Sequence, residues 1–532
     1  MVSADLVVTN ARIYTGKSAT PWAEAFACRE GRIVKVGRRR EVESLAGPGV
    51  RSVDADGRLV LPGFIDAHTH LIWGFELGSW IDLSDRPSLK EAQERLACYA
   101  RENPKEAILL GHGFDYAALK ADGIPGKEAL DEVVSDRPVF FTAWDGHTGW
   151  GNSRFVERAL DVMKGRWKEI GEMQLDPRSG KPTGIFERAF DLTPLLPEVQ
   201  ARRSVDGLLR TVSEASRLGI TTAFDIQVNL EDLHAYAKLR EAGGLTVRIR
   251  IALYHPETTR RDQYIAFEEG RAKFQDDWIR VDAIKLYIDG VAETGTAALL
   301  EPYANRPDSR GRTVYEPGEY RRIVAELDRR GFQVCTHACG DRGVRIALDA
   351  YEYAARANGT RGRRHRIEHC ENLSPEDLPR FARLGVVPCM MPRHAAPELT
   401  TRWREAVGSG RADVSFLWRE LLDAGATLAF ASDWPVVSMN PLVGIGSAVS
   451  MTLAEGRPSP HRISVREAVD GYTRSAAFAL HEEANRGTLA KGKYADFLVV
   501  SEDLFEIPPE RIEETQVLQT FVDGRRVFPT GA

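Results

Sequence analysis

Apolar residues along this chain occur in two patterns: short runs near both ends, and longer runs alternating with amphipathic stretches between them. The N-terminal segment predicts short strands at 5–8, 12–14, 25–28 and 32–36. The tail repeats this pattern at 495–500 and 516–522, and Asp523-Gly524 predicts a hairpin turn. Because neither end has enough strands to bury both faces of a sheet, we expect the two termini to pair into one discontinuous β-sandwich.

Between the termini, β-prone apolar runs alternate with stretches of helical periodicity. This alternation is typical of a parallel sheet covered on both faces, and eight repeats predict a (β/α)8 barrel of the TIM type. The predicted strands are 64–70, 221–226, 247–253, 281–288, 332–337, 365–369, 386–389 and 427–432. The expected fold class is therefore α/β, a TIM-like barrel joined to the β-sandwich of the termini.

The stretch from 71 to about 219 is too long to be a single crossover between barrel strands. It contains β-like pieces of its own at 107–112 and 138–144. We interpret it as an α/β subdomain inserted after the first strand, at about 72–218. The predicted domains are then a composite sandwich of 1–60 and 486–532, and a barrel of 61–485 that carries the insertion.

Composition narrows the class of protein. The chain has 532 residues, 43% of them hydrophobic, and a net charge of -6, which fits a large globular core and gives no reason to expect nucleic acid. No apolar run approaches the ~20 residues of a membrane span, and the N-terminus does not look like a signal peptide. Six cysteines without paired spacing indicate free thiols in a reducing compartment, so we expect a cytoplasmic protein without a membrane partner.

The ends of the predicted barrel strands carry the candidate chemistry. The first strand ends in His68 and His70, which point to one face because residues i and i+2 of a strand do so. A metal ion is the simplest group that two converging imidazoles can share. The corresponding residues of later strands are Lys285 in the fourth, His337 in the fifth, His369 in the sixth and Asp433 after the eighth.

In a barrel of this type the C-terminal strand ends meet at one rim, so these side chains are expected to converge. Imidazoles and a carboxylate suit a divalent ion such as zinc, which lowers the pKa of bound water to ~7 and polarises a carbonyl. Taken alone, Asp433 could simply cap a turn and Lys285 could pair with a carboxylate. Convergence of the whole set favours metal-dependent catalysis.

Seven short motifs connect the chain to a known family: PGFIDAHTH at 62–70, DGH at 145–147, KLYIDG at 285–290, THACGD at 336–341, RIEH at 366–369, SDWP at 432–435 and GTLAKGKYAD at 487–496. With them the chain resembles, nearly end to end, the amidohydrolase superfamily of metal-dependent hydrolases. It is most similar to the amidohydrolase-3, YtcJ-like branch, which includes N-substituted formamide deformylases. The first and last motifs are typical of the superfamily, and the middle ones are specific to the branch.

The resemblance implies a set of metal ligands. His68 and His70 are expected to bind the more buried ion together with Asp433. His337 and His369 are expected to bind a second ion or the substrate, so the resemblance allows either one or two ions.

The resemblance also implies roles around the ions. Lys285 stands where the family has a bridging lysine, whose carbamate, formed with CO2, can link two ions. Glu187 in the insertion is an alternative carboxylate for that place, or a substrate-side residue. His147 is expected to contact the substrate or its oxyanion, or else to be a hydrogen-bonded turn residue. Asp433 is the expected catalytic residue, which takes a proton from the nucleophile and delivers it to the leaving nitrogen.

The expected activity is hydrolysis of the C–N bond of a small-molecule amide or N-substituted formamide by a metal-bound hydroxide, with zinc as the expected ion. The same site could instead support deamination, ester hydrolysis or isomerisation, and a non-catalytic scaffold is a further alternative. A full ligand set argues against the scaffold. The resemblance implies a homo-oligomer, most simply a dimer.

Other interpretations of these residues are open at this point. Residues 365–369 match H-x-x-E-H, an inverted zinc-protease motif that requires a helix, although the segment has room only for a short strand. Four cysteines near strand ends could bind a structural zinc, although buried free cysteine is commoner. They are Cys335, Cys339, Cys370 and Cys389. Aromatic residues of the insertion could line a substrate pocket or form a core: Trp73, Phe75, Trp80, Phe114, Trp144 and Trp150.

Overall fold

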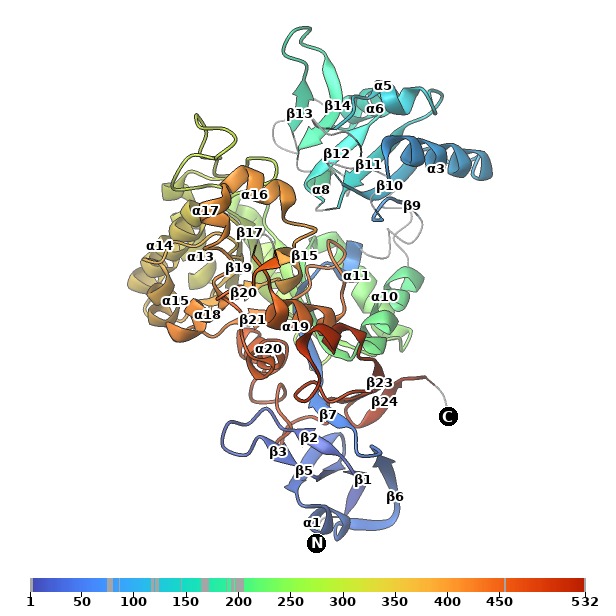
Figure 1. Ribbon diagram of the computed structural model, residues 1–532, viewed down its shortest axis with the longest axis vertical. Coiled ribbons are helices and arrows are strands. Elements are labelled where there is room, and N and C mark those ends of the chain that lie inside the picture. The colour runs from blue at the N-terminus through green and yellow to red at the C-terminus, as the bar shows by residue number, and fades with distance from the viewer. Residues whose placement is uncertain are drawn as a thin grey trace. The chain divides into compact units, whose positions relative to one another are not determined.

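In the computed structural model the described residues are 3–73, 80–85, 87–115, 119, 124–144, 146–163, 172–187, 189–192, 196, 205–453 and 456–530. They form two compact units, one of Met1–His70 and Val212–Ala532 and the other of Leu71–Thr211. Figure 1 shows the helices and strands of both units. Within the described ranges, no helix combines the length and the apolar character that crossing a membrane requires.

The first unit is built around an eight-stranded sheet whose strands follow one another in chain order. All neighbouring pairs are parallel. The strands are β8 (Phe64–Thr69), β15 (Ile220–Val228), β16 (Arg248–Tyr254), β17 (Ile279–Tyr287), β18 (Gln333–Ala338), β19 (Arg366–His369), β20 (Val387–Met390) and β21 (Ala429–Phe430). Each overlaps one of the predicted strands, and the TIM-like barrel is confirmed.

The barrel is closed at its C-terminal rim by backbone hydrogen bonds beyond the last strand. β21 is two residues long, shorter than the predicted 427–432. Past its end, Asp433 N donates to His68 O at 2.8 Å, and His70 N donates to Trp434 O at 2.7 Å. These bonds join the first and last barrel segments, so the backbone itself fixes Asp433 beside the two histidines.

Helices cover the outside of the barrel, and their apolar faces explain why (Figure 1). In α14, for example, Val344, Ala347, Leu348 and Tyr351 form one buried stripe at helical spacing. The described helices of this unit are α1 (Arg39–Glu43), α11 (Leu233–Glu241), α12 (Tyr264–Lys273), α13 (Pro317–Arg329), α14 (Asp341–Asn358), α15 (Leu378–Leu384), α16 (Thr401–Val407), α17 (Ser409–Ala412), α18 (Trp418–Asp423), α19 (Pro441–Ser450), α20 (Val465–Gly471) and α21 (Arg474–Ala479), with the 3-10 helices η2 (Leu230–Asp232), η3 (Arg261–Gln263), η4 (Pro392–Ala395) and η6 (Pro509–Glu514). Helix α10 (Val205–Arg217) includes the boundary between the units.

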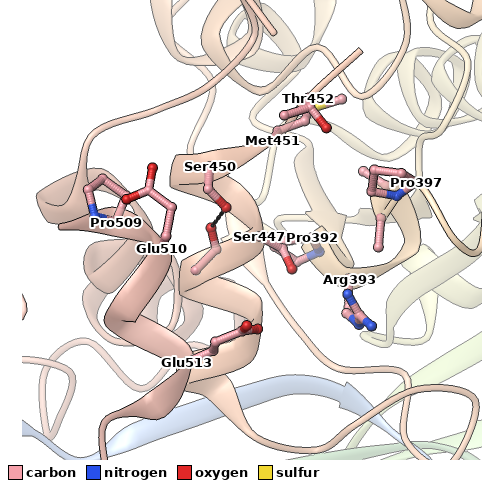
Figure 2. A pocket seen from close by; sticks show the side chains of 13 residues that line it. Pro392, Arg393, Pro397, Ser447, Ser450, Met451, Thr452, Pro509, Glu510 and Glu513 are labelled. Carbon is pink, nitrogen blue, oxygen red and sulfur yellow. Dashed lines mark hydrogen bonds between the residues drawn. The ribbon is translucent and has the colours of Figure 1, made fainter. Parts of the chain in front are cut away.

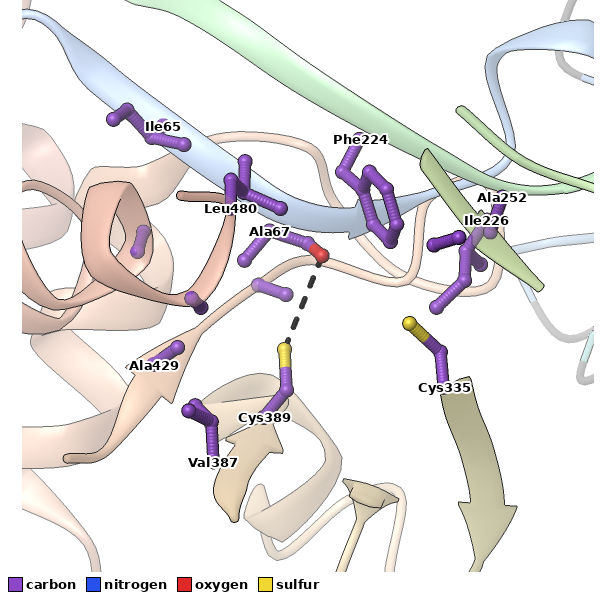
Figure 3. Close-up of a cluster of buried hydrophobic side chains, with 14 of the residues drawn as sticks. Ile65, Ala67, Phe224, Ile226, Ala252, Cys335, Val387, Cys389, Ala429 and Leu480 are labelled. Atoms are coloured by element: carbon purple, nitrogen blue, oxygen red, sulfur yellow. Dashed lines mark hydrogen bonds between the residues drawn. The ribbon is translucent and has the colours of Figure 1, made fainter. Parts of the chain in front are cut away.

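Apolar side chains of several barrel strands form a dry cluster in the barrel interior (Figure 3). Ile65, Phe224 and Val387 belong to it, and they are 1%, 3% and 1% exposed. The Arg366 guanidinium lies 4.6 Å from the Phe224 ring centroid and donates to Ala67 O at 2.6 Å. The charged Arg366 side chain therefore lies directly against this apolar layer.

Two further sheets of the first unit contain the terminal strands, and the second of them pairs strands from both ends of the chain. One has the order β5-β4-β1-β6, with β1 (Ala4–Thr9), β4 (Ala25–Arg29), β5 (Arg32–Gly37) and β6 (Ala46–Asp54). The other has the order β24-β23-β22-β7-β2-β3, with β2 (Arg12–Tyr14), β3 (Trp22–Ala23), β7 (Leu59–Pro62), β22 (Phe497–Val500), β23 (Val517–Val522) and β24 (Arg525–Phe528). Val8, Phe26, Phe497 and Phe521 share one buried cluster. Because these sheets belong to the same compact unit as the barrel, the separate sandwich domain and its boundaries stay a prediction.

The second unit contains a sheet of described strands in the order β13-β14-β12-β11-β10-β9. Its elements are β9 (Ile81–Asp82), α3 (Leu89–Glu102), β10 (Leu109–Phe114), α5 (Glu128–Asp131), β11 (Val139–Ala143), β12 (Thr148–Gly151), α6 (Ser153–Met163), β13 (Glu172–Leu175), β14 (Pro182–Glu187) and α8 (Ala189–Leu192). Trp80, Phe114 and Trp150 are buried in its hydrophobic clusters, as ordinary core packing requires. Phe75 lies outside the described residues.

Candidate metal centre

Three of the predicted ligands converge at the C-terminal rim of the barrel, and we call this group the Asp433 site: His68, His70 and Asp433. The Nε2 atoms of both histidines lie 3.0 Å from the same oxygen, Asp433 Oδ1. All three residues are buried, at 0%, 3% and 5% exposure. One ligand atom from each lies within 4.8 Å of the others, a spacing that can hold a metal ion.

The position of Asp433 depends on a strained backbone held by its neighbours. Its φ of 61° lies in the left-handed region, which side chains other than glycine rarely adopt. Asp66 accepts hydrogen bonds from the backbone N of Ser432, at 3.0 Å, and from its hydroxyl. Together with the bond from Asp433 N to His68 O, these contacts hold the turn in place. The turn aims the Asp433 carboxylate at the histidines.

Glu368 orients His68, a role that the sequence analysis missed. His68 Nδ1 lies 2.8 Å from Glu368 Oε2. Burial would raise the pKa of Glu368, but Arg366, at 2.9 Å, and the bond from His68 lower it to about 2, so the carboxylate accepts and Nδ1 carries the hydrogen. In the neutral form of the ring, His68 Nε2 then presents a lone pair. In the sequence, the glutamate of the RIEH motif at 366–369 was the feature that could have indicated this role.

This tautomer makes the Asp433 site fit a cation. His68 Nε2 is buried without a hydrogen-bond partner, although it lies 3.0 Å from Asp433 Oδ1. Two lone pairs facing each other at that distance repel unless a cation or a proton lies between them. Burial lowers the pKa of His70 to about 4, against the opposing effect of Asp433, so this ring is in the neutral form that binds metals. The donor set matches zinc or a similar divalent ion.

Lys285 is fully buried on β17, close enough for its charge to act on His70, His369 and Asp433. Its Nζ has no hydrogen-bond partner and lies 4.7 Å from the Tyr287 ring centroid. Burial lowers the pKa of Lys285, despite the opposing effect of Glu368. The side chain is thus held near the site as an amine with a reduced tendency to be charged.

His337 and His369 lie side by side at the ends of β18 and β19, with ring centroids 4.4 Å apart. The His369 ring is also 5.2 Å from the His68 ring. Since successive strand residues point to opposite faces, His369 should face away from the side of Glu368. Its φ of 74° breaks this alternation and turns the ring toward the rim.

Two further residues join the rim that the sequence analysis did not select. His394, in η4, has its Nε2 3.6 Å from Asp433 Oδ2 and its Nδ1 3.6 Å from Glu371 Oε1. Glu371 follows β19 and is 7% exposed. The signal for His394 was its place just after the seventh barrel strand, equivalent to the positions of the other candidates.

The two predicted substrate residues belong to the second unit. His147 precedes β12, and Glu187 ends β14. Asp145 of the same motif lies outside the described residues. The substrate contacts expected of His147 and Glu187 stay predictions.

The competing metal sites find no support in the described residues. Residues Arg366–His369 form a strand rather than the helix that a zinc-protease motif needs. His365 instead accepts a hydrogen bond from Val334 N at 3.0 Å. All six cysteines are free thiols, and among the described residues only Cys339 falls into a possible metal group, with His337 and His369.

A cavity of about 220 Å³ lies elsewhere, between η4, α19 and η6 (Figure 2). Arg393, Ser447, Met451 and Glu510 are among its lining residues. None of the candidate ligands lines it. Ser450, also in its wall, donates its hydroxyl to Gly446 O at 2.6 Å. The chemistry is therefore assigned to the rim histidines rather than to this cavity.

Comparison with known proteins agrees with this geometry. The amidohydrolase family matches residues 51–528. The chain is 31% identical to Protein LONG AFTER FAR-RED 3 of Arabidopsis thaliana (99% of this chain, 92% of that protein). It is 28% identical to YtcJ of Bacillus subtilis (strain 168), over 97% and 98%, and 27% identical to N-substituted formamide deformylase of Arthrobacter pascens, over 98% and 97%.

Among solved structures, an uncharacterized metal-dependent hydrolase from Pyrococcus horikoshii OT3 matches with a TM-score of 0.73 and 22% identity. The match covers 95% of this chain and 99% of that chain. At this identity the likeness supports the fold alone. The sequence matches confirm the resemblance that the motifs at 62–70 and 285–290 indicate.

Proposed function

Because the chain belongs to the amidohydrolase family, we propose that it is a metal-dependent hydrolase acting on the C–N bond of an N-substituted formamide or related amide. The observation that carries this proposal is the Asp433 site. The Nε2 atoms of two imidazoles both lie 3.0 Å from one oxygen of the Asp433 carboxylate, and the buried His68 Nε2 has no hydrogen-bond partner, an arrangement that a cation between these atoms stabilises. Zinc is the ion that we propose for this donor set.

A divalent ion held by His68, His70 and Asp433 would supply Lewis-acid chemistry, activating water and polarising an amide carbonyl. Glu368 keeps His68 in the tautomer that such an ion needs. Asp433 is the proton carrier: its carboxylate, held ionised by His68 and His70 against the effect of burial, has a pKa well below its usual value. It takes the proton of the attacking water and delivers it to the leaving nitrogen.

Lys285 is proposed as the carbamylated residue. Burial lowers its pKa, which favours the neutral amine that reacts with CO2. The buried Lys285 Nζ has no hydrogen-bond partner. Carbamylation would convert this amine into an anion that faces the cation. Glu187 stays the alternative carboxylate.

The substrate class follows from kinship with N-substituted formamide deformylase, at 27% identity over nearly the whole chain. His147 and Glu187 are proposed to contact the substrate. A cytoplasmic location and a homodimer remain part of this proposal, and the free thiols of the chain are compatible with a reducing compartment. Light scattering on the purified protein tests the dimer.

The test of the function is a screen of N-formyl and N-acyl amines against zinc-loaded protein, with released amine as the readout and Asp433→Asn as the control. Release of amine by the native protein and not by the variant supports the proposal. If the protein binds zinc but acts only on esters or amidines, the reaction of this site is ester hydrolysis or deamination instead. A protein that binds no metal and turns over no amide would make it a scaffold.

A further inference from the structure

We infer that Tyr287 is a positioning residue, which fixes the orientation of the His337 ring at the rim of the barrel. The inference rests on the proposed function, which makes the position of His337 matter for turnover. Tyr287 is the last residue of β17, and it pairs with His337 of the neighbouring strand β18. Residues paired in this way send their side chains to the same face of a sheet. The two side chains therefore leave the barrel wall together.

The Tyr287 and His337 rings are stacked. Their centroids lie 4.6 Å apart, and their planes differ by 29°. Both side chains are buried, at 8% and 2% exposure. In a close-packed interior an imidazole beside such a ring cannot rotate about its Cβ–Cγ bond without striking the phenol. Tyr287 thus restricts the second side-chain torsion angle of His337.

Tyr287 is itself held by the two preceding strands of the barrel. Its hydroxyl donates to Gln227 Oε1 at 2.5 Å, and Gln227 is 3% exposed on β15. The strand between them is β16, and its last residue, Tyr254, lies edge-on to Tyr287 with ring centroids 6.0 Å apart. The phenol therefore reaches past the end of β16 to bond with β15. These contacts fix the Tyr287 ring, so that it can fix a neighbour in turn.

The turn after β17 holds other atoms of the same histidine. His337 Nε2 donates to Gly290 O at 3.2 Å, and it carries the hydrogen because a carbonyl oxygen only accepts. Asp289 Oδ1 accepts from Cys339 N at 3.1 Å, which fixes the backbone just past the histidine. One ring nitrogen and the nearby backbone are thus set by this turn, and the plane of the ring is set by Tyr287.

The chain contains another stack of tyrosine on histidine, which serves as a matched control. Tyr351 of α14 is stacked on His365, with centroids 4.8 Å apart and planes at 30°. Both residues are buried, at 3% and 8% exposure. His365 precedes β19, so this stack lies at the N-terminal end of the barrel. Loss of either tyrosine ring should lower stability, whereas only the Tyr287 stack orients a ring at the rim.

The test is a double-mutant cycle on kcat/KM of the zinc-loaded protein with a formamide substrate. Tyr287→Leu should lower kcat/KM by about 10- to 100-fold, as misplacement of a group at the site does, and Tyr287→Phe should retain most of it. In a His337→Ala background, Tyr287→Leu should change kcat/KM by less than about 2-fold, because it acts through that ring. Tyr351→Leu should lower the melting temperature and leave kcat/KM unchanged. Full additivity in the cycle would overturn the inference, and so would an equal loss of kcat/KM in Tyr351→Leu.

Nitrogen NMR of metal-free protein reports on the same ring without depending on activity. The protein carries ¹⁵N-labelled histidine, and the His337 signals are identified by their loss in His337→Ala. At mildly alkaline pH the native ring should show one tautomer, with hydrogen on Nε2, as should Tyr351→Leu. Tyr287→Leu should show signals averaged between the two tautomers.

Identical His337 signals in the native protein and in Tyr287→Leu would overturn the positioning role. An inactive native protein would overturn the proposed function alone, and the NMR comparison would then decide the inference.

Discussion

At the N-terminal ends of the barrel strands, buried arginines pair with carboxylates. At the C-terminal ends imidazoles and carboxylates converge around a buried lysine whose amine has no hydrogen-bond partner. Arg250 Nε donates to Glu482 at 2.7 Å, and Arg248 pairs with Asp496 at 3.3 Å. At the other end, His68 Nε2 and Lys285 Nζ lack hydrogen-bond partners. Arg248 and Lys285 are both 0% exposed, so burial alone does not distinguish a site from a structural ion pair. The difference lies in whether the buried cation has a carboxylate within ion-pair distance, as Arg248 and Arg250 have.

This contrast agrees with a general property of such barrels, in which the C-terminal rim carries chemistry and the opposite end carries stability. The backbone shows the same division. His369 and Asp433 adopt positive φ values of 74° and 61° at the rim. Arg248 and Arg250 lie within a regular strand, where no strain is needed to pair them. The two ends should therefore respond to substitution in opposite ways.

The largest expected effect on turnover is that of Asp433→Asn. Loss of the proton carrier and of one anionic ligand should lower kcat by about 1,000-fold or more. The barrel should stay folded, with a melting temperature close to that of the native protein, because the backbone bonds of this turn are kept. Amide hydrolysis with fixed metal content is the measurement. Native-like turnover in this variant would show that the catalytic rim lies elsewhere.

Replacement of Lys285 should separate activity from stability. In metal-free, uncarbamylated protein, Lys285→Met removes a buried amine whose Nζ has no hydrogen-bond partner, so the free energy of unfolding should be unchanged or rise by about 1 kcal/mol. Turnover should fall by about 100-fold, as for groups that tune metal ligands.

Lys285→Ala should regain part of its activity when short carboxylic acids are added, if the carbamate exists. Intact-mass spectra under native, CO2-replete conditions check the modification directly. An unmodified Lys285 in a fully active protein would contradict the bridging role.

Glu368→Gln should have an intermediate effect. The amide no longer fixes the tautomer of His68, so zinc affinity should fall by about 10-fold, and turnover at limiting zinc should fall with it. Saturating zinc should restore most of the activity. Zinc titration against a competing chelator gives the affinity; an unchanged affinity would mean that Glu368 only pairs with Arg366.

The smallest effect on turnover belongs to the opposite end of the barrel. Glu482→Gln leaves Arg250 and its buried neighbours without their carboxylate and should cost about 3 kcal/mol of unfolding free energy. Turnover per folded molecule should be unchanged. The control is Glu502→Gln, where an exposed pair with Arg511 at 3.8 Å should cost no more than about 0.5 kcal/mol. Denaturant unfolding measures the stability of both variants. A loss of bound zinc in Glu482→Gln would contradict the separation of stability at one end of the barrel from catalysis at the other.

The sequence alone determined the barrel and much of its rim. Continuous apolar runs mark buried parallel strands, and each of the eight predicted runs overlaps a barrel strand. His68 and His70 could be paired in advance because a strand alternates with a period of two. Asp433 could be placed beside them only through the assumption that the barrel closes, since 363 positions of sequence separate it from His70.

Tertiary structure decided what local pattern cannot encode. The left-handed turn after β19 reverses the alternation expected for His369, and nothing in a periodic pattern predicts such a reversal. The pairing of Glu368 with His68 spans 300 positions, so the tautomer of that histidine depends on chain closure. His394 comes to the rim from a short 3-10 helix rather than a strand. Periodicity specifies which face of an element is buried, whereas the direction of a side chain past the end of that element depends on contacts with distant segments.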